Sequence, residues 1–457
     1  MAKKVILSIN AGSSSVKVSV FSAAQGTTSV PTQLAEIQLS GLTSPPCAVK
    51  YTRGATNVFK DKEVSNGGNS KDSTGKGIQN QQDAFRYLLD TLVQDEQLAE
   101  IGSAADIDIA CHRVVHGGDY TAPQTITADT YHHLEELTDL APLHNSSALA
   151  IVKLCMSGTG DQGSKVGNSD EKDEEGKSQQ RLLLPRATNV ACFDSQFHAT
   201  IPTHISTYPI KPEIAKNNGL RKYGFHGISY QFITESVAEF LGKPVGETSI
   251  IALHLGSGAS ACAVRKGKSL DTSMGLTPLA GLPGATRSGS VDPSLVFHYA
   301  SDVGKMSPSS TGELHISRAE EILNKESGWK ALTGTTNFGE IASSEDPRHR
   351  LAFDLFVDRV CGFVGSYYVA LRGEVDALVF AGGIGEKSAR LRREVVERAA
   401  CLGFRIDGKR NEAEVDGKDV VVEIGRGEGR THRTLICMTD EQLQMAKQCA
   451  AMEELWR

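Results

Sequence analysis

The chain has 457 residues, of which 39% are hydrophobic and 23% charged, and its formal net charge is −7. This length predicts two or three domains with sizeable cores. The negative charge and the lack of a basic stripe argue against a protein that binds nucleic acid or a membrane surface. Nine scattered cysteines without a C-x-x-C pair, and no signal-like or membrane-spanning apolar run, predict free thiols and a cytoplasmic location.

The first predicted element is a β-hairpin over residues 5–21, in which β-branched residues flank a Gly/Ser loop. A second strand–loop–strand segment, residues 250–265, places Gly256 where the first has Gly12. Either loop alone is compatible with an ordinary tight hairpin. The repetition instead predicts a duplicated phosphate cradle, because small residues let backbone N–H groups approach an anion closely.

Two polar segments, residues 60–82 and 157–180, are unfit for a core. The second is nearly free of apolar residues and mixes Gly and Ser with a charge run. Such a segment cannot bury enough apolar surface to offset the entropy of ordering. Both are predicted to be solvated insertions, although a regulatory or partner-binding role is an alternative for the second.

Helices and strands alternate in the rest of the chain. Helices are predicted over residues 229–241, from Asp292 with Pro293 in the first turn, and over residues 388–402. A third glycine cluster, AGGIGE at residues 381–386, follows the apolar strand DALVF. Together with the two hairpins, this alternation predicts an α/β architecture with a duplicated core.

The glycine-rich segments do not match the common nucleotide-binding motifs. Gly267, Lys268 and Ser269 resemble the end of a Walker P-loop, but Cys262 stands where its first glycine is required. Residues 256–261 formally match a dinucleotide fingerprint, yet the residues after them predict a strand where that fingerprint needs a helix. A different phosphate-binding fold is therefore indicated.

Several His- and Arg-rich motifs point to a family. The segments HRVVHGG, PLHN, FDSQFH, YGFHG and TRSG, together with SINAGSSSVK and GGIGE, resemble those of the acetate kinase family. This family belongs to the acetate and sugar kinase, actin and heat-shock ATPase superfamily, and the resemblance covers almost the whole chain. It implies a two-domain, duplicated ribonuclease-H-like (actin-like ATPase) fold with a cleft between the domains. The implied domains are residues 1–194 with 441–457, on the acyl-substrate side, and residues 195–440, which bind nucleotide.

The implied activity is reversible, in-line transfer of the γ-phosphoryl group of ATP to acetate, with Mg²⁺ or Mn²⁺ as cofactor. The products are acetyl phosphate and ADP, and the family also implies a homodimer. Propionate or butyrate as acceptor, and GTP or pyrophosphate as donor, remain alternatives. A non-catalytic nucleotide switch of the actin or chaperone type is a further alternative, but it would have no use for a second anion site.

The chemistry requires cations, because a carboxylate and a phosphoryl group repel each other. By resemblance, Arg113 and Arg287 bind these two anions, and His226 stabilises the transition state with Arg287. His144 is implied to contact substrate or phosphate. Asp194 matches the family's essential aspartate. Since acetate is already ionised near neutral pH, Asp194 is expected to orient other groups and not to accept a proton, with capping of a strand end as the alternative.

Further positions are implied by the same resemblance. Asn10 and Glu441 match the metal site, and Lys17 matches a contact to the nucleotide phosphates. The acyl pocket is implied to combine Arg113 with Val115, Leu143, Phe225 and Pro278. A pocket of this kind suits one methyl group and tolerates one more methylene, since each is worth about 1–3 kcal/mol of discrimination.

The remaining implied positions bind the nucleotide: His254, Leu255, Gly256, Ser257, Gly258, Asn337, Phe338, Gly339, Gly383, Ile384, Gly385, Glu386 and Lys387. Two departures from the family pattern stand out. Ser257 replaces the usual asparagine near the phosphates. Residues 337–339 replace the usual Asp-x-Arg near the base and ribose, and this loss of both charges is why GTP and pyrophosphate stay open as donors.

Overall fold

The computed structural model describes residues 3–12, 14–25, 30–43, 46–64, 78–137, 142–156, 183–299, 306–307, 310, 317–414, 419–426 and 432–457. The predicted insertion at 157–180, and residues 65–77 of the one at 60–82, lie outside this description. The chain forms two compact units. Unit 1 is Met1–Phe193 with Gln442–Arg457, and unit 2 is Asp194–Glu441. The cleft expected between domains stays a prediction.

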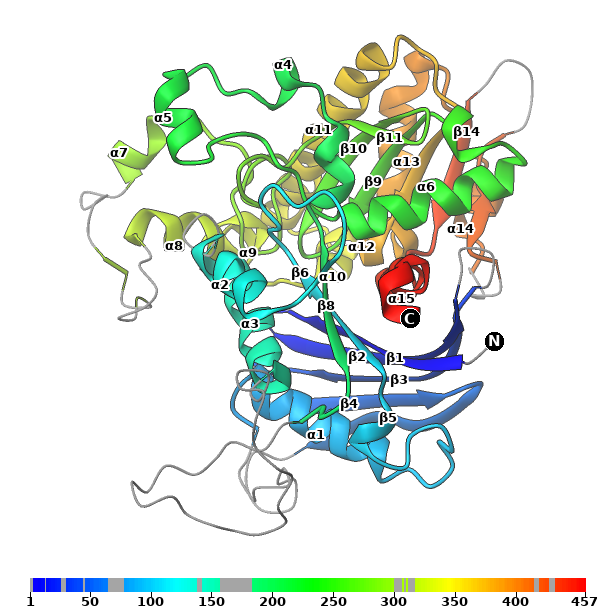
Figure 1. Ribbon diagram of the computed structural model, residues 1–457. Coiled ribbons are helices and arrows are strands. Elements are labelled where there is room, and N and C mark those ends of the chain that lie inside the picture. The colour runs from blue at the N-terminus through cyan, green and yellow to red at the C-terminus, as the bar shows by residue number, and fades with distance from the viewer. Residues whose placement is uncertain are drawn as a thin grey trace. The chain divides into compact units, whose positions relative to one another are not determined.

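Unit 1 contains a sheet of eight strands in the order β5-β4-β3-β2-β1-β6-β8-β7 (Figure 1). The strand β1 is antiparallel to β2 and parallel to β6, which is itself parallel to β8. The bounds are β1 Lys3–Ala11, β2 Ser15–Ala24, β3 Thr32–Ser40, β4 Cys47–Arg53, β5 Thr56–Val64, β6 Ile109–Val114, β7 Gln124–Thr125 and β8 Thr188–Phe193.

The two faces of this sheet follow from the alternation of side chains along β1. Leu7 and Ile9 join the core that also contains buried residues of α1 and α3. Ser8 points the other way, where its hydroxyl donates to the carbonyl oxygen of Gln442 at 3.0 Å. The helices are α1 Gln81–Val93, α2 Ala128–Glu136, α3 Pro142–Met156 and α15 Glu441–Ala451.

Unit 2 contains a six-stranded sheet in the order β11-β10-β9-β12-β14-β13. Its strands are β9 Ile250–Leu255, β10 Ala259–Arg265, β11 Lys268–Thr272, β12 Ala377–Ala381, β13 Val421–Glu423 and β14 Arg433–Cys437. Its helices are α4 Thr203–Ser206, α5 Pro212–Asn217, α6 Gly227–Leu241, α7 Leu295–Tyr299, α8 Arg318–Lys325, α9 Gly328–Thr333, α10 Phe338–Ser343, α11 Pro347–Ala370, α12 Gly382–Lys387, α13 Ala389–Arg398 and α14 Gly408–Glu412.

Side-chain alternation also assigns the faces of the second sheet. Leu253 and Leu255 belong to the main core of unit 2, together with buried residues of α11 and α13. His254, between them, turns to the opposite face and contacts Ser229 on α6. His254, the polar residue of β9, therefore meets α6, while Leu253 and Leu255 pack in the core on the other face of the sheet.

Both sheets repeat one topology, which confirms the predicted duplicated α/β core. Three antiparallel strands are followed by two parallel ones, as β3-β2-β1-β6-β8 in unit 1 and β11-β10-β9-β12-β14 in unit 2. Each Gly/Ser loop joins the equivalent pair of strands, β1 to β2 and β9 to β10. The two predicted cradles thus occupy the same place in each repeat.

Three local predictions were wrong at their boundaries. The helix α6 begins at Gly227, two residues before the predicted start. The helix α7 begins at Leu295 because Asp292 Oδ1 accepts from the backbone N–H of Ser294, forming a turn in place of the predicted first helical turn. The predicted polar insertion at 60–82 overlaps two elements, because residues 60–64 belong to β5 and residues 81–82 begin α1.

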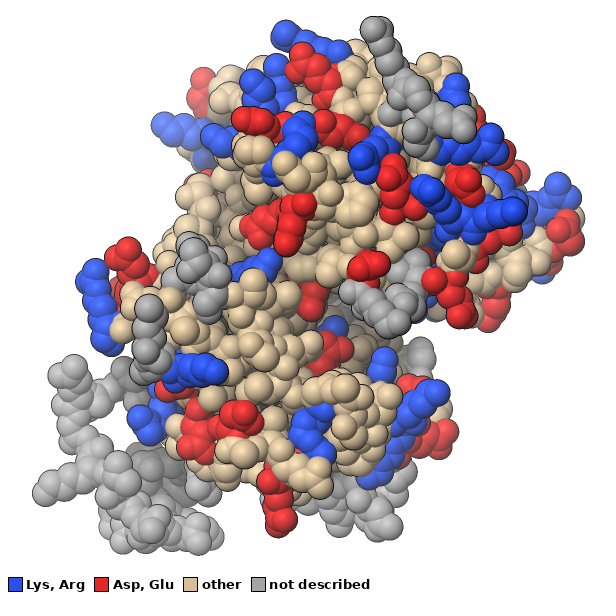
Figure 2. Space-filling view, turned by 90° about the vertical axis from the view of Figure 1, so that its right-hand side faces the viewer, with Lys and Arg blue, Asp and Glu red and all other residues tan. Residues whose placement is uncertain are grey.

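The surface drawn in Figure 2 has Lys and Arg side chains interspersed with Asp and Glu among the described residues, and they do not gather by sign. Within the described parts of the chain, no helix has the length and apolar content needed to cross a membrane. All nine cysteines are free thiols.

Candidate active site

Two nitrogen atoms converge on the second glycine loop, which joins β9 to β10. A Cβ atom added at Gly258 would lie 3.2 Å from Arg287 Nη1 and 3.7 Å from His226 Nε2. The guanidinium and the imidazole therefore flank the backbone of this loop. Such a combination of small residues and aimed donors suits the binding of a phosphoryl group.

The segment before Arg287 packs directly against this loop. The backbone N–H of Ala285 donates to the Ser257 carbonyl at 2.8 Å, and a Cβ at Gly284 would lie 2.7 Å from the same oxygen. On its other side, Thr286 donates through its hydroxyl to the carbonyl of Asn324 at 2.8 Å. These bonds fix the Arg287 backbone relative to the cradle.

His226 has a strained backbone at the start of α6. It is a non-glycine residue in the left-handed region, with φ 60°, and it directly precedes the first helical residue, Gly227. The N–H of Gly227 donates to the Asp194 carbonyl at 2.8 Å, and a Cβ at Gly227 would lie 2.2 Å from that oxygen. Residues held in such conformations cluster at functional sites. The helix N-terminus also adds partial positive charge beside the imidazole.

The His226 ring is held on two sides. Its Nδ1 lies 2.8 Å from Ser260 Oγ, and its ring stacks on that of His254 with centroids 4.3 Å apart. His254 Nδ1 is in turn 2.8 Å from Ser229 Oγ. Both predicted histidines thus have defined orientations on the α6 side of the sheet.

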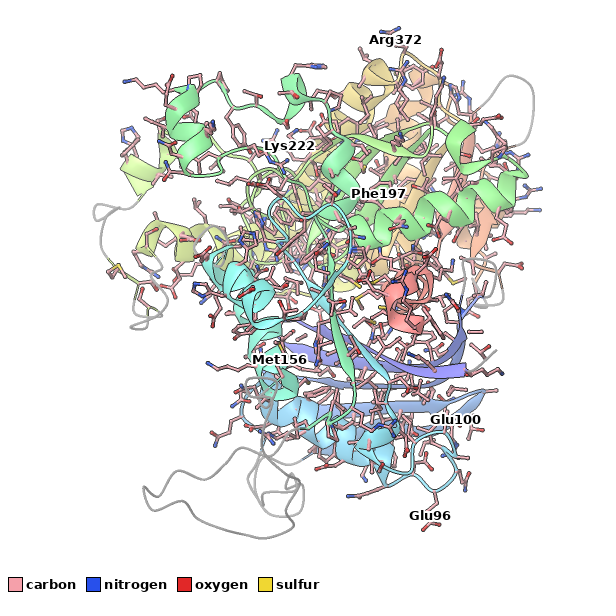
Figure 3. All side chains as sticks on the ribbon, viewed as in Figure 1. Glu96, Glu100, Met156, Phe197, Lys222 and Arg372 are labelled. Carbon is pink, nitrogen blue, oxygen red and sulfur yellow. The ribbon has the colours of Figure 1, made fainter. Side chains whose placement is uncertain are left out.

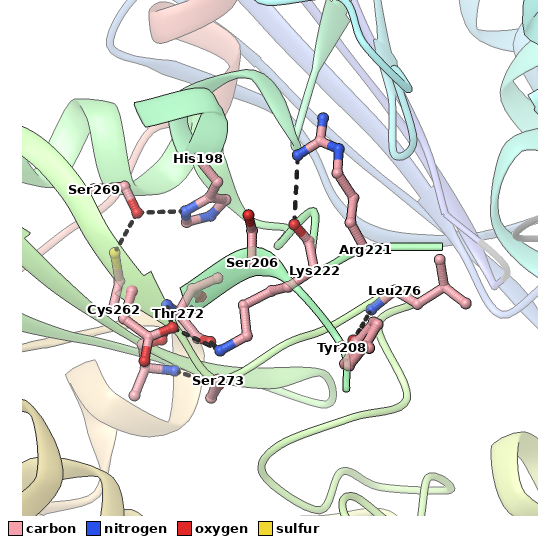
Figure 4. Close-up of polar contacts among 12 residues, drawn as sticks. His198, Ser206, Tyr208, Arg221, Lys222, Cys262, Ser269, Thr272, Ser273 and Leu276 are labelled. Carbon is pink, nitrogen blue, oxygen red and sulfur yellow. Dashed lines mark hydrogen bonds and ion pairs between the residues drawn. The ribbon is translucent and has the colours of Figure 1, made fainter. Parts of the chain in front are cut away.

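A buried histidine supports the turn that precedes His226. Figure 4 shows His198 bonded to Ser269, and Nδ1 and Oγ are 2.8 Å apart. The His198 Nε2 lies 2.9 Å from the Phe225 carbonyl. Because a carbonyl can only accept, Nε2 carries the hydrogen. Burial lowers the pKa of His198 to about 4, so the ring is neutral at physiological pH. Phe197, the neighbouring residue, lies beside the start of α6 (Figure 3).

A pocket of about 610 Å³ opens beside the same glycine loop in unit 2. This volume is typical of pockets for small-molecule ligands and cofactors. Eight of the predicted nucleotide-binding residues line it. The full lining is Gly256, Ser257, Thr336, Asn337, Phe338, Gly339, Ala342, Ser343, Gly383, Ile384, Lys387, Ser388, Ala389 and Arg390.

Further contacts of the predicted nucleotide residues hold the pocket wall in place. Leu255 is fully buried in β9, and the carbonyl oxygens of Gly385 and Glu386 accept from the buried Arg392 at 2.9 and 2.7 Å. Asn337 caps α10, since its Oδ1 accepts from the N–H of Gly339 at 3.0 Å. Asn337 therefore fixes the start of α10 at this wall of the pocket.

Unit 1 brings together three of the predicted residues. Asn10 and Lys17 are directly opposite each other on β1 and β2, and Arg113 Nη1 donates to Asn10 Oδ1 at 3.2 Å. The Lys17 ammonium pairs with Glu36 at 3.0 Å. Val115 is half-buried just after β6. The amide oxygen, ammonium and guanidinium form a polar cluster on this sheet.

The predicted acyl pocket is described in part. Phe225 and Pro278 are both buried in unit 2. Leu143 and His144 lie in the first turn of α3, but their side chains fall outside the described part of the structure. The pocket and the role of His144 stay predictions.

The predicted metal ligands have suitable chemistry. Among the described residues, no three His, Cys, Asp or Glu side chains form a cluster able to hold a metal ion. Mg²⁺, however, favours few protein ligands, oxygen donors and several waters. Asn10 supplies an amide oxygen, and Glu441, the first residue of α15, supplies a carboxylate. These donors fit a hard divalent cation.

Sequence reasoning missed three residues that hold the site in place: Tyr230, Ser260 and Arg392. Ser260 and Tyr230 are fully buried, and Arg392 is 2% exposed. The available signal for Ser260 was a hydroxyl in the otherwise apolar strand ASACAVR. Arg392 gave none, because α13 is rich in arginines that are mostly on the surface.

Comparison with known proteins identifies the family of this chain. The family model described as "Acetokinase family" matches residues 5–159 and 170–447. The chain belongs to the acetokinase family. A "Probable acetate kinase" of Neurospora crassa is 56% identical, and the match covers 100% of this chain and 95% of that protein.

Solved structures of the family have the same fold. The crystal structure of Porphyromonas gingivalis acetate kinase matches with a TM-score of 0.74 and 29% identity, covering 99% of this chain and 100% of that one. A propionate kinase from Francisella tularensis matches with a TM-score of 0.75 and 30% identity, covering 97% and 98%.

Proposed function

We propose that this chain transfers the γ-phosphoryl group of ATP to acetate, reversibly and in line, giving acetyl phosphate and ADP. Its family makes it a phosphotransferase that uses ATP. The main support for the proposal is the arrangement of side chains around the second glycine loop. Arg287 Nη1 and His226 Nε2 lie beside Gly258, and the nucleotide-sized pocket lies beside Gly256 and Ser257. A γ-phosphoryl group at this loop would meet both nitrogens.

In this proposal a carboxylate oxygen of acetate attacks phosphorus, and the oxygen bridging the β- and γ-phosphorus atoms leaves. No general base is needed, because acetate is ionised near neutral pH. Arg113 and Arg287 offset the repulsion between the two anions. His226 adds a donor where charge develops in the transition state. Asp194 orients these cations and fixes the turn before α6.

The metal would be held by Asn10 and Glu441, with waters and substrate phosphates completing its coordination. When bound, Mg²⁺ or Mn²⁺ would neutralise charge on the β- and γ-phosphates. Lys17 assists at the phosphates in this proposal, and its ion pair with Glu36 keeps the ammonium oriented along the sheet until nucleotide binds.

The size of the pocket favours a nucleoside triphosphate over pyrophosphate as the donor, and we propose ATP. A volume of about 610 Å³ suits a nucleoside and is far larger than pyrophosphate requires. The lining residues Thr336, Asn337, Ser343 and Ser388 offer neutral hydrogen-bonding groups for a base and ribose. Rates with ATP, GTP and pyrophosphate, each with acetate, would decide the donor.

The function is tested with purified protein, acetate, MgATP and hydroxylamine, which traps acetyl phosphate as the hydroxamate. We expect Arg287→Ala to lower kcat by about 10²- to 10³-fold, the cost of removing a transition-state donor. Arg350→Ala is the matched control, because Arg350 is exposed and pairs with Glu345 at the surface. No hydroxamate above the no-enzyme control would contradict the proposal.

Propionate is a second candidate acceptor, favoured by the likeness to the Francisella propionate kinase. One methylene changes the free energy of binding by about 1–3 kcal/mol, so selectivity between the two acids would be about 10- to 200-fold. The ratio of kcat/KM for acetate and propionate would identify the preferred acceptor.

We also propose a homodimer that forms through an apolar surface of unit 2. Leu295, Phe297, Leu332 and Leu351 are 39, 72, 40 and 59% exposed. Leu295 and Leu332 border an apolar pocket of about 250 Å³. A second copy of the chain would remove these side chains from water. Light scattering should give twice the chain mass, and Phe297→Asp should reduce it.

Nine free thiols support a reducing compartment such as the cytoplasm.

A further inference from the structure

We infer that Tyr230 and Ser260 set the tautomer of His226, so that its Nε2 is a hydrogen-bond donor toward the transferring phosphoryl group. The three side chains form a buried chain of contacts in unit 2. Ser260 Oγ lies 2.8 Å from His226 Nδ1 and 2.5 Å from the Tyr230 hydroxyl. The inference rests on the proposed function, in which His226 faces that group.

Burial makes the direction of these hydrogen bonds matter. Tyr230 and Ser260 are both 0% exposed, so their hydroxyl hydrogens cannot turn to bulk water. Each must find an acceptor among the neighbouring protein atoms, since a buried unsatisfied donor is costly. Among the described residues, Ser260 Oγ contacts His226 on one side and Tyr230 on the other.

The protonation state of Tyr230 determines the direction of donation in these hydrogen bonds. Burial raises the pKa of Tyr230 well above its usual value, so the phenol keeps its hydrogen, and Ser260 Oγ is the hydrogen-bond partner of that hydroxyl. The phenol therefore donates to Ser260 Oγ. The Ser260 hydrogen then points to His226 Nδ1. The reverse order would leave the phenol hydrogen without an acceptor and is disfavoured by about tenfold or more.

A neutral imidazole that accepts at Nδ1 carries its hydrogen at Nε2. This is the nitrogen that lies beside Gly258, with Arg287 Nη1 next to it. The opposite tautomer would present a lone pair to phosphoryl oxygens and repel them. Tyr230 and Ser260 are thus positioning residues, which act on the reaction through His226.

The tautomer can be measured without turnover by ¹⁵N NMR of the imidazole rings in the full-length protein, with His226→Gln identifying the signals. We expect the wild type to show hydrogen at Nε2. Ser260→Ala should give a mixture of tautomers and lower kcat by about tenfold or more, with KM for ATP nearly unchanged. Ser260→Thr, which keeps the hydroxyl, should restore the wild-type tautomer.

Tyr230→Phe should lower kcat less, and the double variant should be no slower than Ser260→Ala alone, because the phenol acts through the serine. Tyr367→Phe is the control: this tyrosine is also fully buried in unit 2, and its hydroxyl has no partner among the described residues. It should leave tautomer and kcat unchanged.

Hydrogen at Nδ1 in the wild type would overturn the inference, and this measurement does not depend on any variant folding. Unchanged ring signals in Ser260→Ala would overturn it as well. An inactive wild type with hydrogen at Nε2 would instead count against the proposed function while supporting the tautomer assignment, so the two failures are distinguishable.

Discussion

Arg392 offers the sharpest test of how the nucleotide pocket is supported. It is 2% exposed on α13, and its guanidinium donates to the carbonyls of Gly385 and Glu386 at the end of α12. It also binds Asn411 through both Oδ1 and the carbonyl oxygen, each at 2.7 Å. One side chain thus joins α12, which lines the pocket, to α14.

The change Arg392→Met removes four bonds to a charged group while keeping the apolar stem. At about 1.5 kcal/mol each, the low end for such bonds, they contribute roughly 6 kcal/mol. Burial opposes this, since it lowers the pKa of Arg392 from 12.5 to about 10, a cost of about 3 kcal/mol for the charged form. The net loss in the free energy of unfolding should be about 3 kcal/mol or more.

The assay is urea unfolding followed by initial rates at varied ATP and acetate. Arg393→Met is the matched control, because this neighbouring arginine is exposed and pairs with Glu412 at the surface. Its loss should be below about 1 kcal/mol. Arg392→Met should also raise KM for ATP and leave KM for acetate unchanged. If the two variants differ by less than about 1 kcal/mol, the reasoning is refuted.

Two further predictions concern the turn before α6. The folded pKa of His198 is about 4, below the ordinary 6.5, so the unfolded chain takes up the proton first and stability should fall by about 3 kcal/mol as pH drops from 6.5 to 4. His198→Gln should flatten this slope in thermal unfolding, and exposed His132→Gln should not; equal slopes would contradict the assignment. Gly227→Ala should lower kcat about tenfold or more, because its Cβ would displace the Asp194 carbonyl. Gly246→Ala should leave kcat unchanged, because a Cβ atom at Gly246 would have no other atom within 4 Å. A Gly227→Ala variant with wild-type kcat would contradict the prediction and show that the turn tolerates the shift.

Local patterns predicted the repeated hairpins well, because strand alternation and small loop residues are properties of adjacent positions. The start of α6 was missed for a local reason too. Its N-cap is His226 in the left-handed conformation, which has no Ser, Thr, Asp or Asn signature. Asp292 has that signature, but its carboxylate caps a turn instead of a helix.

The motifs identified the family, since their residue types and spacing are read directly from the chain. They include His226, Arg287 and Gly258, but they could not show that the two side chains lie beside Gly258. That meeting depends on β9 and β10 being paired and on the 284–286 segment binding the Ser257 carbonyl.

The sequence by itself determined the duplicated α/β core, the glycine loops and the kinds of cation available to an acyl phosphotransferase. Tertiary structure alone decided which atoms face each other: Nδ1 of His226 toward Ser260, and Arg392 toward the carbonyls of α12. The reason is physical. Hydrogen-bond direction and burial depend on neighbours that packing brings together. Arg392 and Arg393 are adjacent residues of the same type, yet Arg392 is buried while the Arg393 side chain is 40% exposed.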